Sequence, residues 1–490
     1  MELNRDQLIS LVMQLREELQ NVREESRHAR EELKAGRDRI AELEQQLKQQ
    51  SPDTRLDEEY SLKAEERRRN KQSGKRRTQK SARRGRRTTQ EKLDAADRIQ
   101  VVCPDGFDVK ECKLHRQRPV WRIEEGRAVL VAYHIYRGPN GELPDVPGLL
   151  PRCEFGLEIL VTLAFEVVIV GLSMDKTIGQ LGFFWNLSLS KSQVDSLLSR
   201  LARDWEPEFD ALCELLAVSA VVHADETSWS INSVWALLSE KARVLVFGCH
   251  KDAATLEALL PKDVFAGVLV SDDAAVYRNF SQAQKCWAHL IRKAIKLTLQ
   301  APESQQYRRF LDGLLDVYHT AQRIQRDKRF SAAGRAAKID TLDNMLCDLC
   351  GDRFADETEP PTDLEGDYRN LVHELVRLMG ESELFTFVTH PDVDGTNNEA
   401  ERTLRDPAQA RKTGRTSKTI RGARRRTVLT SVLESLRLSL PTFTLSTVVT
   451  EVQGWLTAGI SCFGVLLQTL GLPPPTGSML DAVLPLPGTS

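Results

Sequence analysis

The chain has 490 residues, of which 41% are hydrophobic and 28% charged, which predicts a soluble chain long enough for about three domains. Its 68 Lys and Arg nearly cancel its 70 Asp and Glu, but the charge is segregated. Twelve basic residues and no acid lie from Arg67 to Arg87, and ten basic residues with one acid lie from Arg402 to Arg426. This segregation is typical of nucleic-acid-binding proteins.

Two other classes of protein are excluded by the apolar segments. The charged N-terminus has no apolar stretch of the kind found in secretory signals. The longest apolar run, 157–172, has sixteen residues and carries Glu158 and Glu166, so it is too short and too polar for a membrane span. Nine cysteines without a regular spacing suit a reducing compartment. We therefore expect a cytoplasmic, nucleoid-associated protein with no membrane partner.

The first 98 residues contain two segments without a globular pattern. Residues 1–50 carry apolar or small residues at alternating steps of four and three, from Leu8 to Leu47. This repeat predicts a coiled coil that makes a homo-oligomer, although a single solvated helix has the same pattern. Residues 51–98 are polar and basic, which predicts a disordered linker that either binds DNA phosphates or only solubilises the chain. The candidate DNA-binding residues of this linker are Arg76, Arg77, Arg83 and Arg84.

A small Cys-containing domain is predicted next, at residues 99–153, where short β-type runs alternate with turn signals. The spacing Cys103-x8-Cys112-x2-His115 is not that of a zinc ribbon, so any metal site here is a degenerate one. Residues 154–215 have helical patterns. Within them a Gly and Asn turn leads to a helix capped by Ser190, which indicates either a helix-turn-helix-like DNA-binding segment or two packed helices.

Two carboxylates lie at the ends of predicted strands in residues 216–295. An apolar run from Leu216 to Val222 leads to Asp225, two strands and a helical turn follow, and a fourth strand ends at Asp272. This order is that of a ribonuclease-H-like mixed sheet, in which the two acids lie side by side and need a cation between them. Asp225 could instead cap a strand end, and Glu226 should point to the opposite face.

Residues 391–470 offer a third acid. Asn398, Glu401 and Arg405 recur at i, i+3 and i+7 on a helix that Thr396 or Asn397 can cap, so we expect Asn398 and Glu401 to point into the site. Glu399 competes with Glu401, but two residues on a helix are about 200° apart, so only one of them can face the metals. Hard carboxylates favour two Mg²⁺ ions, with Mn²⁺ as a substitute, for in-line phosphoryl transfer.

Four ordered motifs resemble those of a known family. They are HADETSW at 223–229, SDDAAVY at 271–277, CWAHLIR at 286–292 and NNEAER at 397–402. Together they resemble the core motifs of the insertion sequence 66 family of DDE transposases, and the resemblance covers most of the chain.

The resemblance implies a catalytic, metal-binding triad of Asp225, Asp272 and Glu401. It also implies that Cys286 and His289 form a Cys-x2-His element near that triad. The supporting candidates are Cys286, His289, Asn398 and Arg402. This chain departs from the family in two ways: it lacks the Cys-x2-Cys pairs of a zinc ribbon, and it has Asp272-Asp273-Ala274 where Asp-Gly-Tyr is usual. Tyr277 favours Asp272 over Asp273 as the family's second acid.

The 129 positions from Asp272 to Glu401 exceed what a strand and a helix need, so residues 296–390 are expected to form an all-helical insertion. Cys347-x2-Cys350 within it could complete a zinc site with Cys286-x2-His289, or could pack in a core. The basic strip after Glu401 supplies further candidate DNA-binding residues: Arg405, Arg411, Lys412 and Arg415. The tail, 471–490, is expected to be disordered.

The sequence thus predicts an α/β protein in which a ribonuclease-H-like core is interrupted by a helical insertion and preceded by a coiled coil and a small Cys-containing domain. Its expected function is to bind the terminal inverted repeats of an insertion element, cleave double-stranded DNA there and join the end to target DNA, with possible accessory proteins of the same element. Two alternatives are a non-catalytic DNA-binding derivative and a nuclease that cuts without joining.

Overall fold

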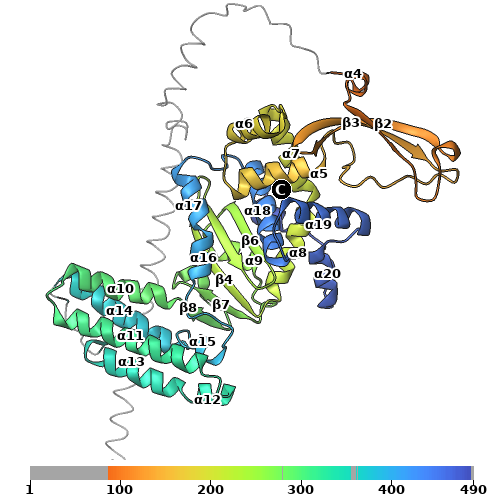
Figure 1. Cartoon of the computed structure of the whole chain (residues 1–490). Helices are drawn as coiled ribbons and strands as arrows, with labels where there is room; N and C mark the ends of the chain where they lie inside the picture. Colours follow the sequence, from red (N-terminus) through yellow and green to blue (C-terminus); the bar gives the residue numbers. More distant parts are fainter. Residues whose placement is uncertain (1–86, 279, 355–359, 361, 487–490) are drawn as a thin grey trace, which may run out of the picture. The chain divides into compact units, whose positions relative to one another are not determined.

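The computed structural model describes residues 87–278, 280–354, 360 and 362–486 (Figure 1). The predicted coiled coil lies outside these residues, as do Arg76, Arg77, Arg83 and Arg84. The chain divides into Met1–Arg86 and Arg87–Ser490, and everything below concerns the second unit. None of its described helices is both long enough and apolar enough to cross a membrane.

The first described elements form a three-stranded sheet in the order β1-β3-β2. Its strands are β1 (Arg98–Val102), β2 (Lys113–Glu124) and β3 (Arg127–Arg137). Helix α4 (Thr89–Asp94) precedes the sheet, begins with a capping box between Thr88 and Glu91, and is docked by a 2.6 Å ion pair between Lys92 and Glu154. The linker that we expected to be disordered through residue 98 therefore gives way to ordered structure by Thr88, because a capped helix and the strand β1 occupy its end.

Four helices follow the sheet, and one of them passes into a π-helical turn. They are α5 (Leu157–Ala164) with the turn η2 (Phe165–Ile169), α6 (Met174–Trp185), α7 (Lys191–Asp204) and α8 (Glu206–Ala217). Asn186, with φ of +55°, ends α6, and the Ser190 hydroxyl accepts a hydrogen bond from the Gln193 amide at the start of α7. Because Val194, Leu198 and the apolar side of α8 are buried, these helices join the main hydrophobic core.

A five-stranded mixed sheet has the order β6-β5-β4-β7-β8 (Figure 1). Its strands are β4 (Val221–Ser228), β5 (Ser233–Leu238), β6 (Arg243–Cys249), β7 (Val268–Ser271) and β8 (Ala283–Lys285). The first three are antiparallel neighbours, whereas β7 and β8 run parallel to β4. Helix α9 (Ala253–Leu259) lies between β6 and β7 in the chain. Leu216, expected in the first strand, instead packs in α8, where its spacing from Leu212 places both on the buried helix face.

The outer strand β6 is closed by hydroxyl groups of helix α18 (Ile420–Ser439). The hydroxyls of Thr427, Ser431 and Ser435, one turn apart, accept hydrogen bonds from the backbone N–H groups of Phe247, Leu245 and Arg243 at 2.9–3.0 Å. An exposed sheet edge invites pairing with other chains. Here the hydroxyl groups of α18 accept hydrogen bonds from the N–H groups of that edge, and these bonds hold α18 against the sheet.

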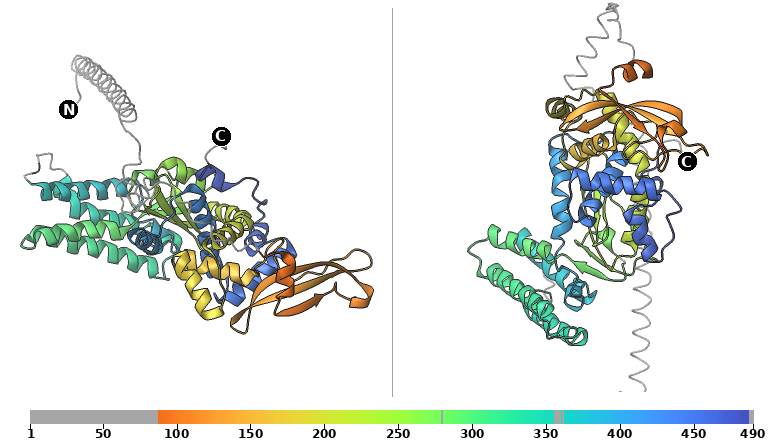
Figure 2. Two further views of the ribbon diagram at one scale, coloured as in Figure 1. Left: turned by 90° about the horizontal axis from the view of Figure 1, so that it is seen from above. Right: turned by 45° about the vertical axis from the view of Figure 1, so that its right-hand side comes forward.

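The described residues between β8 and residue 390 are mostly helical, and their hydrophobic core also includes Val268 and Val270 of β7. The helices are α10 (Trp287–Gln300), α11 (Gln305–Arg326), α12 (Ala332–Ala336), α13 (Ile339–Phe354), α14 (Asp363–Gly380) and α15 (Thr386–Thr389). Figure 2 shows α10, α11, α13 and α14 packed side by side. The Trp287 indole N–H donates to the carbonyl of Leu384 at 2.7 Å, which ties the start of this bundle to the segment beside β8.

The C-terminal part contains α16 (Asn398–Thr403), α17 (Arg405–Lys412) and α18, then α19 (Leu445–Ala458), α20 (Cys462–Thr469) and α21 (Met479–Val483). The expectation of a disordered tail is wrong for residues 471–486. Leu480 and Leu484 are buried in the main core, and Asp481 forms a 2.6 Å ion pair with Arg424. The prolines before residue 476 end one helix but do not prevent the apolar residues after them from packing.

Candidate functional site

The parallel pairing of β4 with β7 brings the first two acids to the same edge. His223 pairs with Val270 in this register, and Asp225 and Asp272 each lie two residues further on. Burial, together with the charges of Glu226, Asp272 and Glu401, raises the pKa of Asp225 to about 7. Asp225 is therefore a largely buried acid on which the other two predicted acids act.

Glu401 is brought to this edge by α16, and Asn397 holds that helix in place. Asn397 is fully buried; its side-chain N–H donates to the carbonyl of Ala224 at 2.7 Å, and its amide oxygen lies 3.2 Å from Nδ1 of His223. Its backbone N–H donates to Sγ of Cys286 at 3.1 Å. Glu401 lies one helical turn after Asn397 on the same face.

Asn398, predicted to support the site, lies at the surface. Asn398 is exposed, because α16 begins at this residue and the position one turn before Glu401 belongs to Asn397. The predicted face shared by Glu401 and Arg405 is also interrupted: α16 ends at Thr403 and a second helix starts at Arg405. Arg402 is exposed and lines a different cavity from the one beside Asp272.

The neighbouring acids that competed for the same roles are paired elsewhere. Glu399 forms a 2.6 Å ion pair with Arg243, and Asp273 pairs with Arg377. Glu226 accepts a hydrogen bond from the Tyr277 hydroxyl and pairs with Lys251. Glu401 is paired as well, with Arg292 at 2.5 Å, whereas its charge and that of Asp272 both act on Asp225.

Cys286 and His289 lie beside Glu401. One potential ligand atom from each of these three residues lies within 4.8 Å of the others, the one such cluster of His, Cys, Asp and Glu among the described residues. Nδ1 of His289 is buried, makes no hydrogen bond within the described chain and lies 3.5 Å from Oε1 of Glu401. Burial lowers the pKa of His289, so the ring is neutral and can donate a lone pair to a cation.

A family model described as Transposase IS66 family matches residues 155–425, over half of the chain. The chain belongs to the IS66 transposase family. No curated protein matches it. The resemblance drawn from the four motifs is therefore confirmed at the level of the family, and membership implies a transposase, an enzyme that acts on DNA.

The four-ligand zinc site considered for this IS66 member is wrong. Cys350 is buried in the core of the helical bundle, and the exposed Cys347 contacts Sδ of Met379 at 3.8 Å. Neither belongs to the cluster around Cys286. Cys103 and Cys112 of the small domain are likewise outside any cluster of three such ligands in the part of the chain that the structure describes.

A cavity of about 550 Å³ opens beside the acids of this transposase. Asp272, Cys286 and His289 line it on the sheet side, and α14 lines it on the other. Its cationic lining residues are Arg278, Lys285, Lys293 and Arg377. Of the three predicted acids, Asp272 alone lines this cavity. Three of these cations are paired with acids: Lys285 with Glu383, Lys293 with Glu374 and Arg377 with Asp273.

The basic strip after Glu401 divides into exposed and structural residues. Arg405, Lys412 and Arg415 are exposed, but Arg411 donates to the carbonyl of Ser228 at 3.0 Å and Arg415 to that of Gly171 at 2.8 Å. Further along, Arg424 pairs with Glu206 and Asp481, and Arg425 pairs with Asp195. These last two arginines stabilise the fold, so the sequence overstated the number of cations that DNA could contact.

Proposed function

We propose that this IS66 member is a DDE transposase that binds the terminal inverted repeats of its element, cleaves double-stranded DNA there and transfers the end to target DNA. The observation that carries this proposal is the convergence of Asp225, Asp272 and Glu401, with the pKa of Asp225 raised to about 7. A structural role alone does not account for Asp225, because a largely buried carboxylate beside the charges of Asp272 and Glu401 costs free energy unless a cation neutralises it.

The donor set fits divalent metal ions. Asp225, Asp272 and Glu401 would hold two Mg²⁺ ions, or Mn²⁺, and the unpaired Nδ1 of His289 is a further ligand or a partner of a bound water. When bound, these ions lower the pKa of the attacking water or 3′-hydroxyl and neutralise charge on the leaving oxygen. Asn397 positions Glu401, and Arg292, 2.5 Å from Oε1 of Glu401, orients that carboxylate.

Two features support a ribonuclease-H-like core with a helical insertion. The strand order β6-β5-β4-β7-β8, with three antiparallel strands followed by two parallel ones, is the order expected for such a core. The helices of residues 287–389 stand between the second and third acids in the chain and share a hydrophobic core that also includes Val268 and Val270 of β7. In this proposal Arg405, Arg411, Lys412 and Arg415 contact DNA phosphates, the N-terminal coiled coil makes the homo-oligomer, and accessory proteins of the element are optional partners.

The test uses a labelled DNA fragment that ends in the element's terminal repeat, with Mg²⁺ and the full-length protein. We expect cleavage and a joined product, both abolished by Asp225→Asn, Asp272→Asn or Glu401→Gln while binding of the fragment persists. Binding without cleavage by the wild-type protein would indicate a non-catalytic derivative. Cleavage without any joined product would indicate a nuclease. Either result refutes the proposal.

A further inference from the structure

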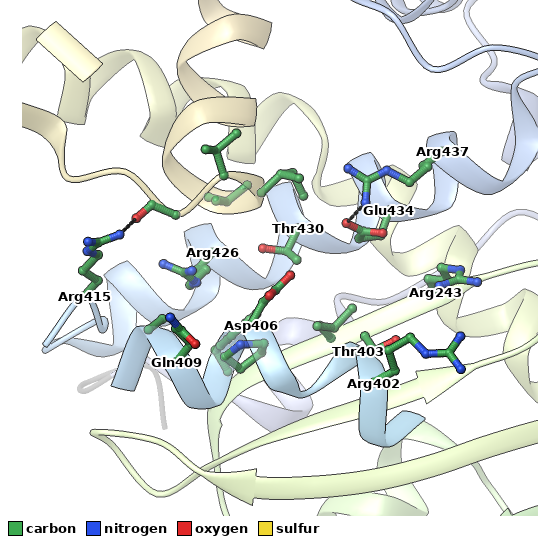
Figure 3. Close-up of a pocket in the computed structure, with 18 of the residues that line it drawn as sticks. Arg243, Arg402, Thr403, Asp406, Gln409, Arg415, Arg426, Thr430, Glu434 and Arg437 are labelled. Atoms are coloured by element: carbon green, nitrogen blue, oxygen red, sulfur yellow. Dashed lines mark hydrogen bonds and ion pairs between the residues drawn. The ribbon is translucent and has the colours of Figure 1, made fainter. Parts of the chain in front are cut away.

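A second cavity, of about 480 Å³, lies on the other side of α16 from the triad. It is formed by η2, β6, α16, α17 and α18, and Figure 3 shows the side chains that line it. Its arginines are Arg243, Arg402, Arg415, Arg426 and Arg437, and its acids are Asp406 and Glu434. The lining is thus strongly cationic.

Most of these arginines already have partners. Arg243 pairs with Glu399 at 2.6 Å, Arg437 pairs with Glu434 at 2.9 Å, and Arg415 donates to a backbone carbonyl. Arg426 has no ion pair within the described residues, and its Nε is buried without a hydrogen-bond partner there. Aromatic rings flank its guanidinium, with the carbon 5.4 Å from the ring centre of Trp229 and 5.2 Å from that of Phe247.

The charge of Arg426 is therefore uncompensated. Burial and the neighbouring Arg425 lower its pKa to about 10, so the guanidinium still carries its proton at neutral pH. A buried cation without a counter-ion is costly, and aromatic faces offset only part of that cost. An anion in the cavity would supply the missing charge and accept from Nε.

Thr430 provides a second unsatisfied group. It lies one helical turn after Arg426, is 5% exposed, and its hydroxyl is buried without a hydrogen-bond partner among the described residues. Arg426 and Thr430 share one face of α18, and in Figure 3 both side chains lie along the cavity. A guanidinium beside a hydroxyl is a donor pair that suits phosphate oxygens.

We propose that this cavity binds one nucleotide of a DNA strand, with its phosphate held by Arg426 and Thr430. The proposal rests on the proposed transposase function for the identity of the strand, and it adds a second point of attachment on α18, next to the helix that carries Glu401. Asp406 and Gln409 line the same cavity. Asp406 would accept a hydrogen bond from the sugar or base, and Gln409 could donate one or accept one. The volume is sufficient for a nucleotide-sized ligand.

The test measures thermal unfolding of the full-length Asp272→Asn protein with EDTA, so that catalysis and metal binding do not contribute. The probes are a short single-stranded oligonucleotide with a 5′-phosphate and inorganic phosphate. We expect the oligonucleotide to raise the melting temperature. Adding Arg426→Gln or Thr430→Val should weaken its binding by about 10-fold or more, the loss expected for a hydrogen bond to a charged group. Arg421→Gln, an exposed residue of α18, is the matched control and should bind like the parent.

Thr430→Val separates binding from folding. Because the hydroxyl has no partner in the described chain, an isosteric methyl should leave the melting temperature of the ligand-free protein unchanged or higher. No oligonucleotide-dependent shift, equal shifts in all variants, or equal affinity for inorganic phosphate would overturn the proposal. These results are independent of strand transfer, so failure of this site and failure of the transposase proposal are distinguishable.

Discussion

Asn397→Ala is expected to damage both stability and activity although the residue is not one of the acids. The substitution removes two side-chain hydrogen bonds, to the carbonyl of Ala224 and with Nδ1 of His223, and leaves both groups buried without a partner. Each lost hydrogen bond with a buried orphan costs about 1–2 kcal/mol, so the free energy of unfolding should fall by about 3 kcal/mol. A shift of Glu401 by about 1 Å should lower DNA cleavage roughly 100-fold.

The matched control is Asn398→Ala, one residue along the chain but exposed at the start of α16. Its effect on unfolding should stay within about 0.5 kcal/mol, as for most surface substitutions. Urea denaturation followed by circular dichroism, and cleavage of a labelled element end, give the two readouts. Equal costs for the two substitutions, or a cost below about 1 kcal/mol for Asn397→Ala, would refute the role assigned to Asn397.

Three further predictions concern charge, the sheet edge and the cysteines. The pKa of Asp225 is raised from its ordinary value to about 7, so the folded protein binds this proton more tightly than the unfolded chain does. The protonated carboxyl group therefore stabilises the metal-free protein at low pH, and that stability should be lost as the pH rises from about 4 through 7. Mg²⁺ should restore it above pH 7 and bind more weakly below, as calorimetry from pH 5.5 to 8 would show; a pH-independent affinity would contradict this. Ser431→Ala should cost about 1–3 kcal/mol in urea denaturation, because the buried N–H of Leu245 loses its acceptor, and an unchanged midpoint would contradict the account of the β6 edge. Cys347→Ser should leave both the melting temperature and the zinc content measured by metal analysis unchanged, since this thiol lies outside any cluster of ligands; loss of bound zinc would revive the discarded site.

The acids could be located from the sequence because local signals were sufficient for them. Apolar runs mark the strands that precede Asp225 and Asp272, and parallel pairing places the ends of such strands together. Glu401 was separable from Glu399 by helical geometry alone. The asparagine that faces the sheet was misplaced by one residue: Asn398 was expected there, and Asn397 occupies the position. The exact start of a short helix decides which of two adjacent asparagines faces the sheet, and helix ends are the least predictable part of a helix.

The basic strip after Glu401 shows that the local sequence does not reveal which charged side chains are paired within the fold. Arg424 and Arg425 are paired with acids more than 200 positions earlier, so nothing near them in the chain reveals that their charge is used inside the fold. The hydroxyls of α18 are a different case. A stripe of Thr427, Ser431 and Ser435 on a helix is unusual for a face turned toward a core, and it was a readable sign that the helix satisfies polar backbone groups.

The two sides of α16 and α17 explain why acids and bases alternate so closely in residues 397–430. Glu401 and Asn397 face β4, whereas Arg402 and the cavity of Arg426 and Thr430 lie on the side of β6 and α18. In the two proposals above, a helix of this kind separates carboxylates that would bind a metal from a cation that would bind an anion, so that the two do not neutralise each other as ion pairs. Arg243 illustrates the alternative, because it is paired with Glu399 and therefore has less charge to offer a ligand than Arg426. The near-zero net charge of the chain therefore does not describe the charge at either position, because opposite charges lie on the two sides of this helix.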